Sequence, residues 1–451
     1  MAAMAYNENR LMLEQISCDC GLQHGVPDMD IYIGSGILGQ LPAYLGRRNL
    51  GTHVVVITDN IVHDIAGRAV VDLLRQAGYA VKLCLLEREE PLLPNEAALG
   101  EVLLTMDTAT EFFVSVGSGT LTDIARCVAS CTGKPFVSVG TAASMDGYTS
   151  VIAPLLHGNQ KVNKPAGYPE VLVCDIEIMK TAPPAMMISG FGDVVGKYIA
   201  KADWILGRIV NGETYCPACV SIIDDAVGHC VAAIDEIRQG TEAGVQRLIE
   251  GLVMAGLTVL IIGHTRAVAS MEHNMGHYWE MLKLQRGEDH PSHGTAVGVA
   301  TGYVLRFYEQ FLSADLKDVD LAAIQEQRWT AAQREQAVMQ AYGQAVGRKL
   351  LDQEDNGLIS WDEQLRRIRV LQENMDRIRA EIAFLPSLAE LMAMYERLGA
   401  PKTAAEIGIE RDLLTNSLLY GKDYRNRYSV FNAAWELGCL DEWVQAVVDN
   451  E

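Results

Sequence analysis

The chain has 451 residues, of which 49% are apolar and 21% charged, the balance of an ordinary globular protein. Its length exceeds what one hydrophobic core supports and predicts two or three domains. The formal net charge of −21 argues against a protein that binds nucleic acid or inserts into an anionic membrane. Any phosphate-bearing ligand must therefore be held by local hydrogen-bond donors.

The N-terminus, MAAMAYNENR, has no basic segment followed by an apolar run, so we expect no signal peptide. The longest apolar stretch, 252–263, is too short to span a bilayer. No second C-x-x-C accompanies Cys216 and Cys219 among the ten scattered cysteines. We therefore expect neither a closed zinc site nor a redox pair, but ordinary buried thiols in a reducing, cytoplasmic protein.

Residues 1–182 are predicted to form an α/β domain with a parallel, Rossmann-like sheet. Several of its expected strands are continuous apolar runs, typical of parallel strands buried on both faces. These strands are DIYIGS, HVVVITD, AVKLCLLE, EFFVSVGS, PFVSVGT and VLVCDIEIM. Helical stretches such as 62–78 and 121–133 alternate with them. Ligands of such a domain sit at the carboxyl ends of the strands.

A glycine-containing turn follows the strand EFFVSVGS. The turn and the helix start comprise Gly117, Ser118, Gly119, Thr120 and Leu121. Glycine lets a phosphate approach the backbone, and the free N–H groups of a helix start favour an anion. The segment matches neither G-x-G-x-x-G nor a P-loop. The alternative is a tight turn that needs glycine only for its geometry.

Two further strand ends carry small, hydroxyl or acidic side chains. The segment TAASMDGYTS gathers Thr141, Ser144, Asp146 and Ser150 within ten residues. The strand HVVVITD ends in Asp59, which suits the ribose hydroxyls of NAD and disfavours a 2′-phosphate. The alternative role for Asp59 is to cap the helix that follows. Together the three strand ends favour a dinucleotide site.

Residues 183–451 show helical periodicity almost throughout and are predicted to form an all-helical second domain. Amphipathic or charge-laced helices are expected at 327–346 and 362–382. Near the start of this domain, Asp193 lies among glycines and apolar residues. A carboxylate there is costly unless it is paired, for example with Lys197, or coordinated.

The stretch ASMEHNMGHYWEM places His273 and His277 four residues apart, on one face of a helix. Glu272 precedes the first histidine and points about 100° away from it, so the H-E-x-x-H protease arrangement is excluded. The pair indicates either a metal site or two hydrogen-bonded core histidines. His290 and His293 follow before a helix rich in small residues. One carboxylate with two imidazoles and an open position is typical of a catalytic metal site.

The motifs GSGTLTD, TAASMDGYTS, GFGDVVGKY and EHNMGHYWEM, with HG at 293, stand in an order that resembles sn-glycerol-1-phosphate dehydrogenases. The resemblance is to the bacterial type and covers nearly the whole chain, including the tail AAEIGIERDLLTNSLLYGKDYRNRYSVFNAAWELG. These enzymes are relatives of glycerol dehydrogenase in the iron-containing alcohol dehydrogenase and dehydroquinate synthase superfamily. The resemblance implies a dehydroquinate synthase-like fold and a homodimer.

The resemblance also implies residue roles. A divalent metal, which zinc, nickel and iron all fit, would be bound by Asp193, His273 and His293. Asp146 and His277, with Asp193, would contact the substrate. NAD or NADP would be held by Gly117 to Leu121, by the turn of Thr141, Ala142, Ala143 and Ser144, and by Ser150. One segment departs from the family pattern S-R-P-A-S-G-x-E-H: here TRAVASMEH keeps Arg266 but lacks the proline and the glycine.

The expected reaction is the reversible, NAD(P)H-dependent reduction of dihydroxyacetone phosphate to sn-glycerol-1-phosphate, a glycerophospholipid precursor. The alternatives are a glycerol or other polyol dehydrogenase, a dehydroquinate synthase-like lyase and a non-catalytic metabolite-binding protein. Only a phosphorylated substrate requires a cationic side chain that binds its phosphate. The candidates for that role are Arg266, Lys161, Lys164 and Lys197, and each is equally compatible with a solvated or structural charge.

Overall fold

The computed structural model describes the chain apart from residues 1–4, 13–15, 26, 159, 318 and 354–356. The described residues form two compact units. Unit 1 comprises residues 1–19, 23–194 and 218–264, and unit 2 comprises residues 20–22, 195–217 and 265–451.

Unit 1 contains an eight-stranded sheet with the order β1-β2-β3-β10-β7-β6-β4-β5. The strands are β1 (Ala5–Asn7), β2 (Arg10–Met12), β3 (Asp30–Gly34), β4 (His53–Asp59), β5 (Ala80–Leu86), β6 (Phe112–Gly117), β7 (Phe136–Gly140) and β10 (Val171–Asp175). The hairpin β1–β2 joins β3 antiparallel, and the other neighbours are parallel. Every residue of β6, β7 and β10 is buried, as expected for strands covered on both faces.

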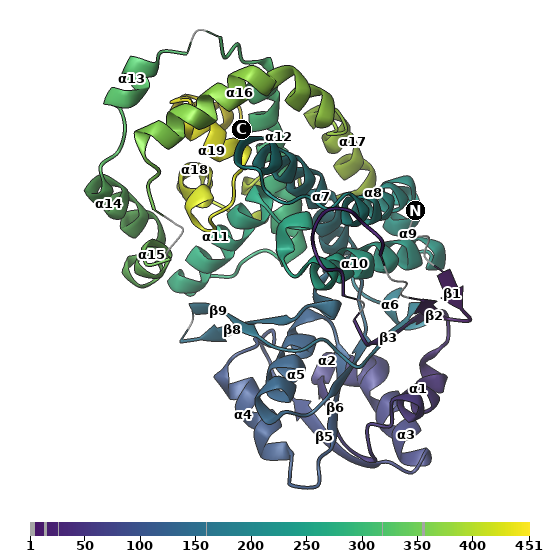
Figure 1. Cartoon of the computed structure of the whole chain (residues 1–451). Coiled ribbons are helices and arrows are strands. Elements are labelled where there is room, and N and C mark those ends of the chain that lie inside the picture. The colour runs from purple at the N-terminus through teal and green to yellow at the C-terminus, as the bar shows by residue number, and fades with distance from the viewer. Residues whose placement is uncertain (1–4, 13–15, 26, 159, 318, 354–356) are drawn as a thin grey trace. The chain divides into compact units, whose positions relative to one another are not determined.

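Helices cover both faces of this sheet (Figure 1). One face, with Val54 and Val56, packs against α1 (Leu41–Arg48) and α3 (Arg68–Gln76). The other face, with Val55 and Ile57, packs against α4 (Glu96–Thr105) and α5 (Gly119–Thr132). Shorter helical segments are η1 (Leu38–Gln40), α2 (Asn60–Val62), η2 (His63–Gly67), η3 (Gly147–Thr149) and α6 (Ile176–Met179).

The neighbouring strands β4 and β6 send the chain to opposite faces. β4 leads through α2 and η2 to α3, whereas β6 leads to α5. Their carboxyl ends therefore form the topological switch point of the sheet, where open α/β sheets bind ligands. The predicted α/β architecture is confirmed, and Asp59 and Gly117 end the two strands at this point.

Three features of the sheet region differ from the sequence prediction. The apolar run VLVCDIEIM is strand only to Asp175, whose side chain accepts a hydrogen bond from the Glu177 N–H at 3.0 Å and caps α6. The hairpin β8 (Ile152–His157) and β9 (Gln160–Pro165) was not predicted, because its partly exposed residues lack a continuous apolar run. The short hairpin β1–β2 was missed as well.

The chain is mostly helical from Pro184 onward, close to the predicted change at residue 183. The first helices are α7 (Pro184–Asn211), α8 (Pro217–Ala232), α9 (Ile234–Gln239) and α10 (Glu242–Ile262). The compact units do not follow this change of secondary structure. Helix α7 continues from unit 1 into unit 2 after Val194, while α9 and α10 belong to unit 1.

Helix α10 contains the apolar stretch 252–263 and is longer than that stretch. It has 21 residues and is the one helix among the described residues that is long and apolar enough to cross a membrane by length and composition. The apolar stretch alone therefore underestimates the length of the apolar helix. Of its apolar window, 72% is buried inside the structure, which is typical of a core helix.

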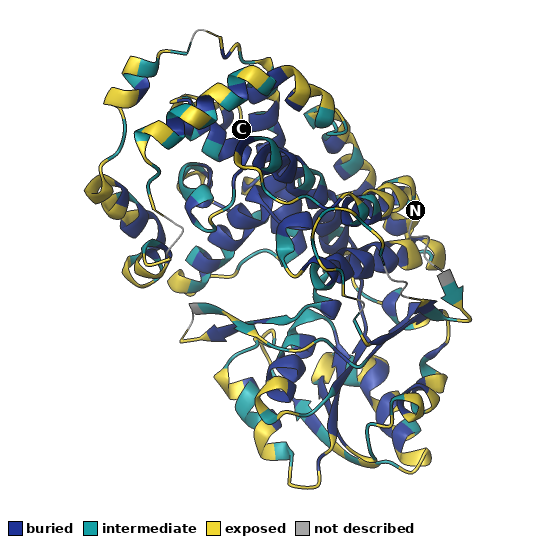
Figure 2. Cartoon of the chain, viewed as in Figure 1, coloured by how far each residue is buried: buried dark blue, intermediate teal, exposed yellow. Residues whose placement is uncertain are grey.

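Unit 2 is helical. Its helices are α11 (Met271–Arg286), α12 (His293–Ser313), α13 (Leu321–Glu326), α14 (Ala331–Tyr342), α15 (Gln344–Leu351), α16 (Trp361–Glu381), α17 (Leu388–Leu398), α18 (Arg411–Tyr420), α19 (Val430–Glu436) and α20 (Leu440–Asp449), with the short segments η4 (Thr265–Ala267), η5 (Ala405–Ile407) and η6 (Gly421–Asp423). Helices α11 and α12 are largely buried, and α16 alternates buried with exposed residues (Figure 2).

The two helices predicted at 327–346 and 362–382 have different outcomes. The second is confirmed as α16. The first is interrupted by Gly343, which has a φ of +77° and separates α14 from α15. A side chain rarely adopts this backbone conformation, so the glycine permits the break.

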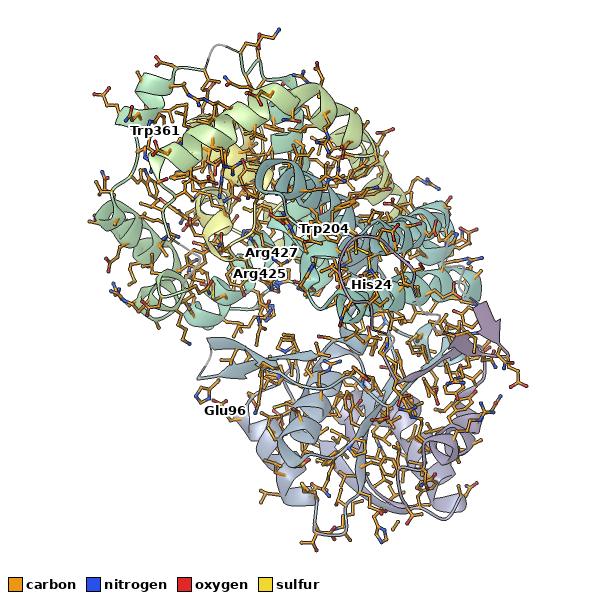
Figure 3. All side chains as sticks on the ribbon, in the orientation of Figure 1. His24, Glu96, Trp204, Trp361, Arg425 and Arg427 are labelled. Atoms are coloured by element: carbon orange, nitrogen blue, oxygen red, sulfur yellow. The ribbon has the colours of Figure 1, made fainter. Side chains whose placement is uncertain are left out.

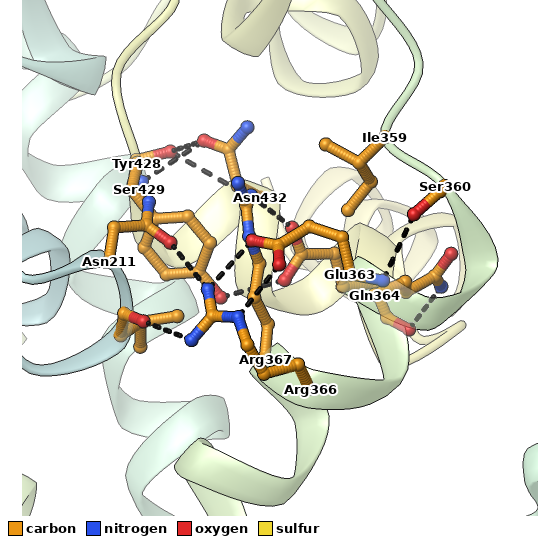
Figure 4. A network of polar contacts seen from close by, with 12 residues as sticks. Asn211, Ile359, Ser360, Glu363, Gln364, Arg366, Arg367, Tyr428, Ser429 and Asn432 are labelled. Carbon is orange, nitrogen blue, oxygen red and sulfur yellow. Dashed lines mark hydrogen bonds and ion pairs between the residues drawn. The ribbon is translucent and has the colours of Figure 1, made fainter.

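An ion-pair network joins α16 to α19 and the segment before it (Figure 4). Arg367 donates a hydrogen bond to Glu436 at 2.8 Å, and the Tyr428 hydroxyl donates to the same carboxylate at 2.9 Å. Arg366 and Arg367 both donate to Glu363 at 2.7 Å. Burial raises the pKa of Glu436 to about 7, whereas the hydrogen bond from Arg366 is the main cause that lowers the pKa of Glu363 to about 2.

Candidate active site

The turn after β6 is closely packed against its own helix. A Cβ on Gly117 would lie 2.2 Å from Cδ1 of Leu121, so only glycine fits there. Helix α5 begins at Gly119, and the Ser118 side chain does not cap it. The first N–H groups of α5 therefore depend on another acceptor, which is what a phosphate supplies.

The second turn, Thr141–Ser144, lies beside the first and is held from several sides within unit 1. The Thr141 N–H donates to the Gly117 carbonyl at 3.1 Å. The Tyr148 hydroxyl donates to the Ala142 carbonyl at 2.8 Å, and the Ser189 hydroxyl of α7 donates to the Ser144 carbonyl at 3.1 Å. A Cβ on Gly190 of α7 would lie 2.1 Å from the Ala143 carbonyl oxygen. The turn is thus fixed in position by α7 and η3.

Two of the predicted nucleotide contacts have local structural partners. The Val62 N–H donates to Asp59 Oδ1 at 2.7 Å, so Asp59 caps α2, as the alternative interpretation expected. The Ile152 N–H donates to the Ser150 hydroxyl at 2.9 Å, at the start of β8. The cap uses one carboxylate oxygen and leaves Asp59 at the switch point, so the two roles of Asp59 are compatible.

A buried arginine that the sequence analysis did not identify holds η3 in place. Arg126 of α5 is fully buried and donates to the carbonyls of Gly147 at 2.6 Å and Tyr148 at 3.0 Å. It also pairs with Asp123, whose pKa is raised to about 7 by burial. No spacing rule marks such a residue, because its partners are backbone carbonyls distant in sequence.

Asp146 and Asp193 are brought together within unit 1. The Asp146 N–H donates to Asp193 Oδ2 at 3.0 Å. Asp193 is fully buried on α7. A buried carboxylate that keeps its charge requires donors or a cation nearby, and this backbone N–H is one such donor.

The structure also brings together the three residues that the resemblance identifies as metal ligands. Asp193, His273 and His293 each offer a ligand atom, and these atoms all lie within 4.8 Å of one another. Asp193 and His273 are buried, and His293 is half-buried. One carboxylate and two imidazoles suit zinc, nickel or iron, so the donor set fits a divalent metal. His290 lies outside this group, with its Nδ1 atom 3.0 Å from the Pro291 carbonyl oxygen.

The position of His273 follows from the packing of α11. Glu272, fully buried, accepts a hydrogen bond from the Ser270 N–H at 3.0 Å, and its Oε1 atom lies 2.6 Å from His273 Nδ1. Gly276 faces α12, where a Cβ would meet Ala296 and Val297 at 3.5 Å, so the helices approach closely. With Nδ1 donating to Glu272, the Nε2 atom of His273 keeps its lone pair for a metal.

His277 lies on the same face one turn later. Its ring centroid is 5.1 Å from that of His293 and 6.2 Å from that of His273. Its Nδ1 atom is 3.5 Å from Glu280 Oε2, and the Tyr424 ring lies 5.6 Å away. A second group of side chains that could hold a metal ion consists of His277, Glu280 and His293. The interpretation of His273 and His277 as a mutually hydrogen-bonded pair finds no support in this separation.

Arg266 is part of the buried framework around the segment before α11. It donates to Glu213 at 2.9 Å, to the Asp203 carbonyl at 2.8 Å and to the Tyr428 carbonyl at 2.6 Å, and is 4% exposed. Arg266 is therefore a structural charge, as one of the two sequence interpretations expected. Lys164 lies 2.8 Å from the Cys131 sulfur, and Lys197 is 1% exposed.

Two further arginines, Arg425 and Arg427, lie at this segment. Arg427 donates to the Ala269 carbonyl at 3.0 Å and to the Thr265 hydroxyl at 2.7 Å. Burial, followed by the like charges of Arg425 and Arg266, lowers the pKa of Arg427 to about 9. The Nη1 atom of Arg425 is buried without a hydrogen-bond partner among the described residues. Figure 3 shows Arg425 and Arg427 close together in unit 2.

The expectation that all cysteines are buried holds for six of them. Cys18, Cys20 and Cys439 are half-buried, and Cys131 is exposed. Cys18, Cys20, His24 and Cys216 form a further group whose ligand atoms lie within 4.8 Å of one another. The expectation that no zinc site is present rested on the lack of a second C-x-x-C, and the spacing of these four residues does not follow that pattern.

Comparisons with known proteins agree with the sequence resemblance. Residues 32–183 match the family of iron-containing alcohol dehydrogenases. A protein of Halalkalibacterium halodurans named glycerol-1-phosphate dehydrogenase (NAD(P)+) is 35% identical over 295 residues, which are 65% of this chain and 74% of the relative. One of the same name from Geobacillus thermodenitrificans is 29% identical over 415 residues, 91% of this chain and 92% of the relative.

Solved structures share the fold at low sequence identity. A probable glycerol dehydrogenase from Sinorhizobium meliloti is 17% identical with a TM-score of 0.60, covering 95% of this chain and 99% of that one. A maleylacetate reductase from Rhizobium sp. is 15% identical with a TM-score of 0.60, covering 94% of this chain and 97% of that one.

Proposed function

Because the chain belongs to the glycerol-1-phosphate dehydrogenase family, we propose that it reversibly reduces dihydroxyacetone phosphate to sn-glycerol-1-phosphate with NAD(P)H. The observation that carries this proposal is the grouping of Asp193, His273 and His293 within 4.8 Å. A protein that only binds a metabolite has no need of such a set. The oxidoreductase function also accounts for the ligand-binding character of the strand ends in unit 1.

NAD or NADP is proposed to bind at the switch point of the sheet. The start of α5 and the Thr141–Ser144 turn offer backbone N–H groups to the pyrophosphate. Asp59 is assigned to the ribose hydroxyls. A bound nicotinamide supplies the hydride, and the fixed turns of the protein determine which face of the substrate meets it.

Asp193, His273 and His293 are proposed to hold one divalent metal, with zinc, nickel and iron as the candidates. When bound, such an ion polarises the carbonyl oxygen of the ketone. Glu272 orients the His273 ring, and the Asp146 N–H orients the Asp193 carboxylate. A proton must reach the substrate oxygen, and His277, backed by Glu280, is the side chain assigned to that transfer.

The substrate phosphate is proposed to bind Arg425. A buried guanidinium nitrogen without a partner is costly, and a phosphate oxygen satisfies it with a charge-assisted hydrogen bond. A phosphate beside Arg425 also offsets its repulsion of Arg427. The centroid of the neighbouring Tyr424 ring is 5.6 Å from that of His277. The proposed phosphate site is therefore next to the residues assigned to the reacting carbonyl. Arg266 is excluded from this role by its buried partners.

Location and assembly follow from the same proposal. A soluble, phosphorylated three-carbon substrate and a dinucleotide cofactor are found in the cytoplasm, so we place the enzyme there. We retain the homodimer that the family resemblance implies.

The experiment follows NADH absorbance, as consumption of NADH with dihydroxyacetone phosphate or dihydroxyacetone and as formation of NADH from NAD+ with glycerol. The proposal predicts turnover with the phosphorylated ketone and little with the other two. An Arg425→Gln variant should raise KM for dihydroxyacetone phosphate by about tenfold or more, since hydrogen bonds to charged groups contribute roughly 1.5–3 kcal/mol. Its residual rate with dihydroxyacetone should not change. Arg411→Gln, which removes an exposed arginine paired with Asp449, serves as the matched control. Equal losses with both ketones would remove Arg425 from the phosphate site.

A further inference from the structure

We propose that the protein binds a second metal ion, a structural zinc held by Cys18, Cys20, His24 and Cys216. Each of these residues offers one ligand atom, and the four atoms lie within 4.8 Å of one another. The dehydrogenase reaction uses none of them. The proposal therefore stands apart from the proposed function.

The local chain suits a metal loop. Residues 16–25 form neither helix nor strand, so no backbone ladder fixes their conformation. Within them, the spacing Cys18-x-Cys20-x-x-x-His24 places three ligand types in one short segment, and His24 is marked in Figure 3.

Cys216 supplies the fourth position from an ordered element. It is fully buried and directly precedes Pro217, the first residue of α8. The start of a helix stabilises negative charge, so a thiolate is favoured at this place. Cys219, the third residue of α8, is not a member of the group.

The chemistry of the set identifies the ion. Three thiolates and one imidazole fill all four tetrahedral positions of zinc, and such closed sites are structural. Soft sulfur ligands exclude magnesium and calcium. Ligand bonds of about 2.3 Å set tetrahedral zinc ligand atoms roughly 3.8 Å apart, so the observed grouping needs only small side-chain movements to close. The Asp193 group has no sulfur and offers only three ligands, so the two sites differ in chemistry.

Bound zinc would fix the conformation of residues 16–25, which have no helix or strand. Metal binding is coupled to folding wherever the ligands lie on a chain that lacks other constraints. Zinc is expected to protect residues 16–25 from proteolysis and to raise the thermal midpoint of the whole chain.

The test measures zinc per chain by elemental analysis in full-length protein produced with zinc. The Cys18→Ser/Cys20→Ser double variant should lose one zinc per chain. Cys131→Ser removes an exposed cysteine outside the group and should keep the wild-type content. Equal zinc in the double variant and in the wild type would overturn the proposal.

A second measurement uses the wild-type chain and so does not depend on the folding of a variant. Cobalt replaces zinc, and thiolate ligands give a sulfur-to-cobalt charge-transfer absorption that the Asp193 group cannot produce. We expect one such centre per chain. Its absence, or recovery of Cys18 and Cys20 as a disulfide from protein purified with zinc, would contradict the site. Neither readout requires dehydrogenase activity, so failure here leaves the proposed function intact.

Discussion

The Oε1 atom of Glu272 lies 2.6 Å from His273 Nδ1, and both side chains are buried. Directly before His273, Glu272 does not occupy the general-base position of an H-E-x-x-H motif. The structure gives it a different position, beside the imidazole that is proposed to bind the metal.

Glu272→Gln should weaken metal binding by about ten- to 100-fold, because the carboxylate fixes the tautomer of His273 and raises its basicity. Metal affinity is measured by titration of the metal-free protein, with its thermal midpoint as a check on folding. Glu280→Gln is the matched control, since Glu280 faces His277 instead. Equal affinities of the Glu272→Gln variant and the wild type would show that Glu272 does not position His273.

His273 and His277 share a helix face but are assigned different work. His273→Ala removes a metal ligand, so metal content and rate should fall together. His277→Ala should keep the metal and lose about ten- to 150-fold in kcat/KM, the equivalent of roughly 1.5–3 kcal/mol. Metal per chain, thermal midpoint and kcat/KM are measured for both variants side by side. Complete loss of metal from His277→Ala would refute this division.

Asp59 should make the enzyme favour NADH over NADPH, because its carboxylate repels a 2′-phosphate. Asp59→Asn is the informative change, since asparagine caps helices as well as aspartate and so keeps the bond to the Val62 N–H. The ratio of kcat/KM for NADPH to that for NADH should rise in this variant. An unchanged ratio would assign Asp59 to the helix cap alone.

Glu436 predicts a pH dependence of stability. Burial raises its folded-state pKa to about 7 from the model-compound value of 4.5, so the folded chain binds a proton that the unfolded chain has lost. The stability it contributes is fully present below pH 4.5 and is lost as pH rises through about 7. The free energy of unfolding of the wild type, minus that of Glu436→Gln, should therefore fall with rising pH across this window. Denaturant titrations at several pH values measure it, and a constant difference would contradict the shifted pKa.

The sequence predicted the strands that carry the nucleotide site because continuous apolar runs mark buried parallel strands. It failed at Asp175, where the run continues into α6 and only the side-chain cap marks the boundary. The metal residues were recognised through motifs and not through spacing, because Asp193 and His273 are 80 residues apart and only folding joins them. Arg126 escaped notice for the same reason, because the carbonyls that it binds are more than 20 residues away in sequence. In the group around Cys18 only Cys216 is distant in sequence, and folding alone brings it to the other three.

The most direct test of the central claim is oxidation of the two glycerol phosphate enantiomers in separate reactions with NAD+. The account predicts NADH formation with sn-glycerol-1-phosphate, none above background with sn-glycerol-3-phosphate, and loss of the reaction in His293→Ala but not in His290→Ala. Turnover of sn-glycerol-3-phosphate or of unphosphorylated glycerol in preference to sn-glycerol-1-phosphate would contradict it.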